Sequence, residues 1–138
     1  MARILSIDYG KKRTGLAVTD PLQLIAGGLA TVLTSELFDY LVRYVAAEAV
    51  ERIVIGEPRQ PNGQPSENLA RVQQFVNRWR KARPDIPIEY YDERFTSVLA
   101  HQAMIDGGLK KKARQDKALV DEISATIILQ DYMRSKNL

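Results

Sequence analysis

Asp8 is the first residue whose type and position suggest chemistry. It directly follows the apolar run at residues 4–7, and Gly10 and Gly15 stand close behind it. Between these glycines lie three cations, Lys11, Lys12 and Arg13. A carboxylate beside glycines and cations is the combination expected where a metal ion and a phosphate meet, because oxygen ligands hold the metal and cations bind the phosphate.

Other acids also stand directly after apolar runs. Glu57 follows Ile55-Gly56, and Asp92 and Glu93 follow Tyr90-Tyr91. If these strands and the strand before Asp8 are parallel neighbours, their carboxyl ends share one edge of a sheet, where ligands of open α/β sheets bind. We therefore expect these carboxylates to converge.

Asp121 lies on a predicted C-terminal helix and shares an otherwise uncharged stripe with Ala118, Ala125, Ile128 and Tyr132. An acid on an apolar helical face costs several kcal/mol unless it is paired or binds a metal. A fourth carboxylate of the same site is one interpretation. The alternative is a local ion pair with Lys117, four residues earlier, or a position at the edge of the apolar face from which the carboxylate reaches solvent.

The composition favours a hard cation for such a site. The chain has no cysteine, and His101 is its only histidine. Oxygen ligands therefore dominate, which favours Mg²⁺ or Mn²⁺ over zinc. Paired divalent ions held by carboxylates activate water and stabilise the leaving oxygen in phosphodiester hydrolysis.

Clustered cations suggest a polyanionic partner, although the net charge is only +3. The alternative is a solvated charged surface. We expect the phosphates of a nucleic acid to be bound by Lys11, Lys12, Arg13, Arg94, Lys110, Lys111 and Lys112.

Periodicity and breakers predict the elements that position these residues. Strands are predicted at 3–8, 14–19, within 25–33, at 52–56 and at 86–91; helices at 36–50, from 66 to Pro84, from Thr96 or Ser97 to Gly107, and at about 116–134. Short turns join the first three strands and helices join the later ones. The sequence thus predicts one α/β domain, residues 1–138, with a mixed five-stranded sheet flanked by helices. Its first three strands are antiparallel and the next two are parallel.

No apolar stretch approaches the roughly 20 residues that span a bilayer, and no secretory segment opens the chain. We expect a cytoplasmic protein without membrane contact. The sequence leaves open whether it is a monomer or a homodimer.

Four blocks of this sequence resemble the YqgF/RuvX family, the pre-16S rRNA nucleases that are also described as Holliday junction resolvases. The blocks span nearly the whole chain: Ile7-Asp8-Tyr9-Gly10 with Thr14-Gly15-Leu16-Ala17; Ile55-Gly56 and Pro58 with Asn62-Gly63; Asp92-Glu93-Arg94 with Thr96; and Lys117, Asp121, Ser124-Ala125 and Ile128-Leu129.

The resemblance implies an RNase H-like fold and a metal-dependent endonuclease that matures the 5′ end of 16S rRNA. Cleavage of branched DNA, as by a Holliday junction resolvase, is the alternative. By motif, the catalytic and metal-binding acids are Asp8, Glu93 and Asp121, and Asp92 is either a supporting ligand or a residue that contacts the ligands without binding the metal. Glu57 stands where the family usually has leucine, so it is either an additional ligand or a solvent-facing substitution.

Two other functions fit parts of the pattern. Actin-like ATPases also carry an acid and glycines across their first hairpin, but they clamp nucleotide between two such domains and 138 residues suit only one. A non-catalytic RNA-binding ribosome-assembly factor would use the basic clusters, yet it leaves the acids without a role.

Overall fold

A computed structural model describes residues 2–58, 67–92 and 117–136. The strands are β1 (Arg3–Asp8), β2 (Arg13–Thr19), β3 (Ala26–Leu33), β4 (Val50–Glu57) and β5 (Ile88–Asp92). The helices are α1 (Leu37–Ala47), preceded by the 3₁₀ turn η1 (Thr34–Glu36), then α2 (Leu69–Ala82) and α5 (Lys117–Ser135).

The five strands form one mixed sheet in the order β3-β2-β1-β4-β5. The β1–β2 and β2–β3 pairs are antiparallel, whereas the β1–β4 and β4–β5 pairs are parallel. The predicted mixed sheet, with three antiparallel strands followed by two parallel ones, is therefore confirmed. The parallel arrangement of β1, β4 and β5 places the ends of these strands at a common edge.

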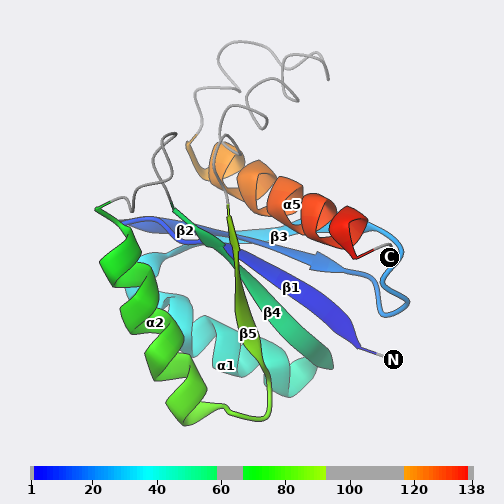
Figure 1. Ribbon diagram of the computed structural model, residues 1–138, viewed down its shortest axis with the longest axis horizontal. Coiled ribbons are helices and arrows are strands. Elements are labelled where there is room, and N and C mark those ends of the chain that lie inside the picture. The colour runs from blue at the N-terminus through cyan, green and yellow to red at the C-terminus, as the bar shows by residue number, and fades with distance from the viewer. Residues whose placement is uncertain (1, 59–66, 93–116, 137–138) are drawn as a thin grey trace.

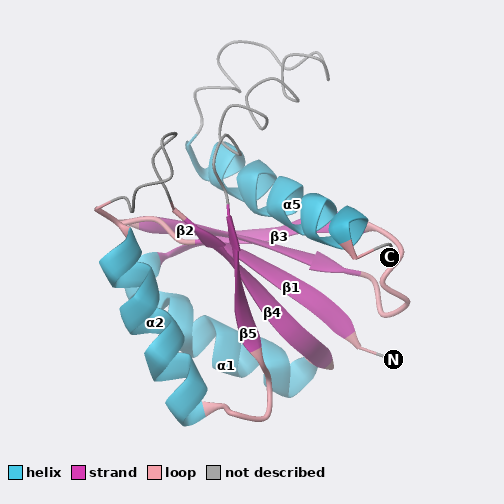
Figure 2. Ribbon diagram, viewed as in Figure 1, coloured by secondary structure: helices cyan, strands magenta, loops and turns pink. Residues whose placement is uncertain are grey.

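Helices cover both faces of the sheet (Figures 1 and 2). Helices α1 and α2 pack on one face and α5 packs on the other. Alternation along β1 divides its side chains accordingly: Leu5 and Ile7 join the cluster beneath α1 and α2, whereas Ile4 joins the cluster beneath α5. This division decides which acids meet at the sheet edge.

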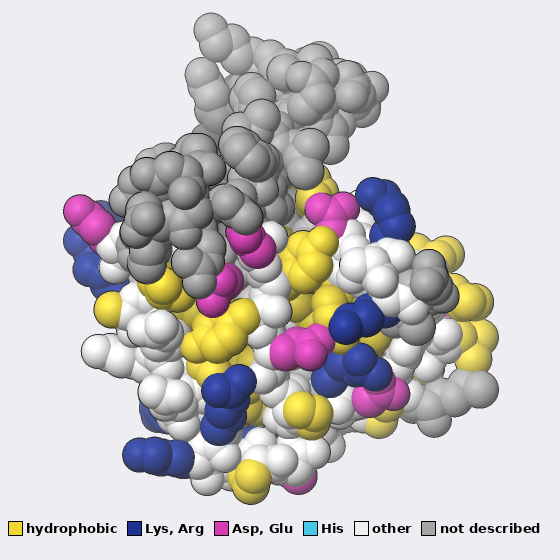
Figure 3. Space-filling view, viewed as in Figure 1, with side chains coloured by type: hydrophobic (Ala, Val, Ile, Leu, Met, Phe, Trp, Pro, Cys, Tyr) yellow, Lys and Arg dark blue, Asp and Glu magenta, His cyan; other side chains and the backbone are white. Residues whose placement is uncertain are grey.

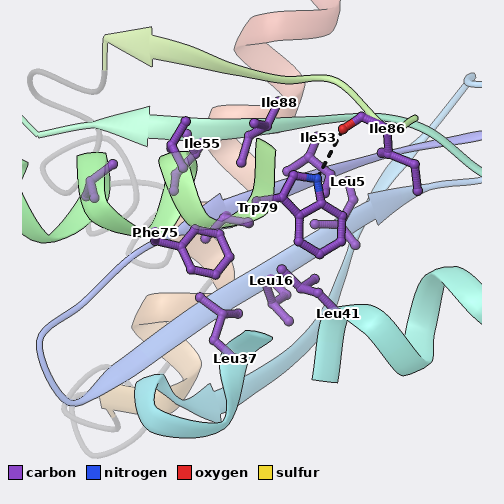
Figure 4. Packing of buried hydrophobic residues seen from close by; sticks show 13 residues of the cluster. Leu5, Leu16, Leu37, Leu41, Ile53, Ile55, Phe75, Trp79, Ile86 and Ile88 are labelled. Atoms are coloured by element: carbon purple, nitrogen blue, oxygen red, sulfur yellow. Dashed lines mark hydrogen bonds between the residues drawn. The ribbon is translucent and has the colours of Figure 1, made fainter. Parts of the chain in front are cut away.

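Trp79 is the largest fully buried side chain and centres the core beneath α2 (Figure 4). Its indole Nε1–H donates a hydrogen bond of 3.1 Å to the carbonyl oxygen of Ile86. Its ring lies edge-on to Phe38, with 5.8 Å between centroids. This hydrogen bond joins α2 to the segment that leads into β5.

The observed element bounds differ modestly from the predicted ones. Helix α1 ends at Ala47, before the predicted residue 50, because Val50 already belongs to β4 and the Ala49 carbonyl accepts the Arg3 N–H. The predicted helix beginning near Thr96 lies outside the described residues. None of the described helices is long and apolar enough to cross a membrane.

Candidate active site

Asp8 ends β1 and its side chain lies on the α5 face of the sheet. Two observations fix that face. Ile4 packs beneath α5, and the Ser6 hydroxyl donates a buried hydrogen bond of 2.6 Å to the Ala125 carbonyl on α5. Because side chains two residues apart point to the same face of a strand, Asp8 follows Ile4 and Ser6 toward α5.

Gly15 lets Asp121 approach Asp8. Gly15 is the direct cross-strand partner of Asp8, and residues paired in this way share a face of the sheet. A Cβ added at Gly15 would overlap the Asp121 carbonyl and lie 2.9 Å from the Glu122 nitrogen. The absence of a side chain thus lets the α5 backbone touch β2 at the level of Asp8. The structure brings Asp8 and Asp121 to one place.

Arg13 supplies a positive charge at the same place. Its Nε lies 3.5 Å from Asp121 Oδ2, and the two side chains are 38% and 29% exposed. Arg13 precedes Gly15 by two residues, so alternation also directs it toward α5. The Nε atom is buried and, within the described residues, has no hydrogen-bond acceptor. The sequence pattern predicts that Arg13 binds nucleic acid; it does not predict this ion pair, because the approach of α5 to Gly15 is tertiary.

The turn between β1 and β2 is held by a hydrogen-bonded threonine pair. Thr34 donates to the Gly10 carbonyl at 2.7 Å, and the Thr34 and Thr14 hydroxyls lie 2.8 Å apart. A side chain at Gly10 would strike the Arg13 carbonyl. The turn is therefore fixed and presents Lys11 and Lys12, both exposed, at its tip.

Glu57 and Asp92 share the sheet edge with Asp8 but lie on the other face. They are register partners at the ends of β4 and β5. Glu57 follows Ile55, which packs beneath α1 and α2, and Asp92 follows Tyr90, which packs against the same cluster. Alternation therefore turns both away from α5. Burial raises the pKa of Tyr90, and the nearby Glu57 charge contributes in the same direction.

Tyr9 anchors the end of β1 on that second face. Its ring packs against Phe75, with 5.7 Å between centroids, and its carbonyl accepts a hydrogen bond from Asn68 at the start of α2. Burial raises the pKa of its hydroxyl, although the positive charge of Arg71 opposes the shift. Tyr9 therefore stays neutral at neutral pH and serves to fix Asp8 in position.

The other predicted site residues, Glu93, Arg94, Lys110, Lys111 and Lys112, lie outside the described residues. Within the described ranges, no three acidic or histidine side chains are grouped to hold a metal. Asp8 and Asp121 supply two carboxylates on one face. That pair fits Mg²⁺, which keeps several waters and is usually bound through one or two carboxylates.

Comparison with known proteins reveals relatives along nearly the whole chain. The family model RuvX, described as Holliday junction resolvase, matches residues 2–135. A Phocaeicola vulgatus protein named "Putative pre-16S rRNA nuclease" is 68% identical over 136 residues, which are 99% of this chain and 98% of that protein. A Bacteroides fragilis protein of the same name is 60% identical over the full length of both chains.

Solved structures show the same fold. Thermus thermophilus RuvC in complex with a Holliday junction substrate matches with a TM-score of 0.60 over 98% of this chain and 96% of that one. A second Thermus thermophilus RuvC structure gives a TM-score of 0.55. At 18% and 16% identity these matches establish the fold alone, and the predicted RNase H-like fold is confirmed.

Proposed function

Because the chain belongs to the RuvX family, whose members are nucleases, we propose that it hydrolyses phosphodiester bonds with a divalent metal ion. We further propose that its natural substrate is the 5′ end of precursor 16S ribosomal RNA. The names of the Phocaeicola vulgatus and Bacteroides fragilis relatives support this substrate. An rRNA substrate would place the activity in the cytoplasm.

The observation that carries the proposal is the meeting of Asp8 and Asp121 across Gly15. These carboxylates would hold Mg²⁺ or Mn²⁺, with Glu93 as the third ligand expected from the family motif. The bound cation would activate water and stabilise the departing oxygen. Asp8 and Asp121 would fix the position of this cation, because a strand end and a close-packed helix hold their backbones in place.

The cations at the β1–β2 turn would bind substrate phosphates beside this site. Lys11 and Lys12 are exposed on a turn held by Thr14 and Thr34. On the face shown in Figure 3, Lys and Arg are interspersed with Asp and Glu rather than forming a uniform basic surface. We therefore expect Lys11 and Lys12 to contribute to phosphate binding, together with Arg94, Lys110, Lys111 and Lys112, which lie outside the described residues.

Branched DNA is a second candidate substrate, favoured by the family description. A resolvase cuts two strands symmetrically and so acts as a homodimer, whereas an RNA-trimming enzyme can act as a monomer. The two substrates therefore also differ in the assembly that they require.

A cleavage assay decides between these substrates. The purified protein is incubated with a precursor 16S rRNA fragment, a four-way DNA junction or linear duplex DNA, in Mg²⁺, in Mn²⁺ and in EDTA. We expect metal-dependent cleavage of the rRNA fragment near the mature 5′ end and little cleavage of linear duplex. Preferential cutting of the junction would assign the resolvase activity instead.

Asp8→Asn tests whether the protein is a catalyst at all. We expect the variant to bind the rRNA fragment and to lose cleavage by about 10²-fold or more, because it removes a metal-binding oxygen charge. Equal processing by variant and wild type would contradict the nuclease proposal. Binding by both without cleavage by either would instead support the RNA-binding assembly factor.

A further inference from the structure

Arg13 neutralises a carboxylate that the proposed nuclease needs for its metal. The Arg13 Nε and Asp121 Oδ2 atoms lie 3.5 Å apart, and no described residue accepts a hydrogen bond from this buried Nε. We propose that Arg13 is an internal counter-ion that occupies Asp121 in the metal-free protein and that a divalent cation must displace. This inference rests on the proposed metal-dependent function.

The geometry indicates that Arg13 and Asp121 attract each other by charge and that another cation can replace Arg13 at Asp121. A charge-assisted N–H···O bond has its atoms about 2.7–2.9 Å apart, so a separation of 3.5 Å is an ion pair without a formed hydrogen bond. About a third of each side chain is exposed, although the Arg13 Nε atom itself is buried, so solvent reaches the outer atoms of the pair. An arginine in a permanent structural role would instead be expected to satisfy its buried Nε.

The charge balance explains why the acids need such a counter-ion. Gly15 packs Asp121 against β2 opposite Asp8, so two carboxylates gather on one face of the sheet. Like charges in proximity repel, and one guanidinium offsets part of that repulsion. A metal ion that binds Asp121 would therefore compete with the Arg13 guanidinium for the same carboxylate.

Displacement would give the guanidinium a second use. Arg13 begins β2, directly after the exposed Lys11 and Lys12 at the turn tip. Once released, its planar group would reach a substrate phosphate, which arginine binds through two parallel hydrogen bonds. Metal binding would then precede and strengthen nucleic-acid binding, so that the site is loaded in a fixed order.

Calorimetric titration of Mn²⁺ into nucleic-acid-free protein tests the inference, because it shows whether removing Arg13 raises or lowers the affinity for the metal. We expect Arg13→Gln to bind Mn²⁺ about 1.5- to 5-fold more tightly than wild type, the range of a partly exposed ion pair that no longer has to be broken. Arg13→Lys keeps the charge and is expected to stay near wild type. Lys12→Gln is the matched control, because it removes the same charge one residue away at the exposed turn tip, and it is expected to change the affinity less.

Unchanged or weaker Mn²⁺ binding by Arg13→Gln would overturn the inference, and weaker binding would show instead that Arg13 positions Asp121. If wild type binds no Mn²⁺, the metal-dependent function fails and this inference fails with it.

A titration of wild type with Mg²⁺, followed through the Arg13 Nε–H nuclear magnetic resonance signal, needs no variant. We expect this signal to shift with the midpoint of metal binding, and a signal that stays constant while the metal binds would refute displacement.

Discussion

Gly15→Ala is the substitution that most directly perturbs the meeting of Asp8 and Asp121. The new Cβ would lie 2.9 Å from the Glu122 nitrogen and closer still to the Asp121 carbonyl. Ordinary contact begins at 3.4 Å, so α5 must withdraw by at least 0.5 Å, and by more at Asp121. Both neighbours are backbone atoms, so no side-chain rotation relieves the overlap.

This displacement acts on both catalysis and stability. A misplacement of about 1 Å at a catalytic site costs about 10²-fold in rate, so we expect cleavage to fall by about 10- to 100-fold. Overpacking costs about 1–3 kcal/mol, which lowers the melting temperature by roughly 3–12 °C in a domain of this size. Single-turnover cleavage of the rRNA fragment and calorimetric melting measure the two effects.

Gly27→Ala provides the matched control in the neighbouring strand β3. The chemical change is the same, but a Cβ at Gly27 has no atom within 4 Å. We expect its melting temperature and cleavage rate to match wild type. The reasoning is refuted if Gly15→Ala also behaves as wild type, because α5 would then tolerate a side chain between Asp121 and β2.

Three further predictions concern the core, a surface turn and the second pair of acids. Trp79→Phe removes the indole N–H and leaves the Ile86 carbonyl without this hydrogen-bond donor. We expect the free energy of unfolding, measured by urea denaturation, to fall by about 1–3 kcal/mol. A smaller decrease would show that this hydrogen bond is dispensable. The backbone N–H of Ile25, followed by those of Leu24 and Leu22, lowers the pKa of Asp20. A depressed folded-state pKa stabilises the fold above the unfolded value of about 3.9, and this contribution is lost as the pH falls through the folded-state pKa. The melting-temperature gap between wild type and Asp20→Asn should therefore be present at neutral pH and close in acid, and a gap that persists in acid would contradict this assignment. Glu57→Gln should leave Mn²⁺ affinity unchanged in calorimetry, because alternation turns Glu57 away from Asp8; weaker binding would identify Glu57 as a ligand.

Most of the fold was predictable from the sequence because its signals are local. Apolar runs and breakers located the strands, and the order of elements determined which strands run parallel. The end of α1 was less predictable, because Val50 joins β4 through pairing with β1 rather than through local preference. Tertiary pairing overrides a helical pattern at such boundaries.

The site was predictable only in part. Asp8 and Asp121 are signalled by a strand end and a helical stripe, and the structure brings them together. Glu57 and Asp92 lie on the second face because side chains alternate between the two faces along a strand. The expectation that all the acids converge considered only the edge of the sheet and not its two faces. The Arg13–Asp121 ion pair joins residues distant in sequence and depends on the close approach of α5 to Gly15. Local patterns do not encode that approach.

The central claim is that Asp8 and Asp121 form a divalent metal site on the α5 face of the sheet. Anomalous diffraction from a crystal soaked in Mn²⁺ tests it most directly. We predict a manganese peak within coordination distance of carboxylate oxygens of Asp8 and Asp121. Manganese bound instead by Glu57 and Asp92, or no bound manganese when calorimetry shows binding in solution, would contradict the account.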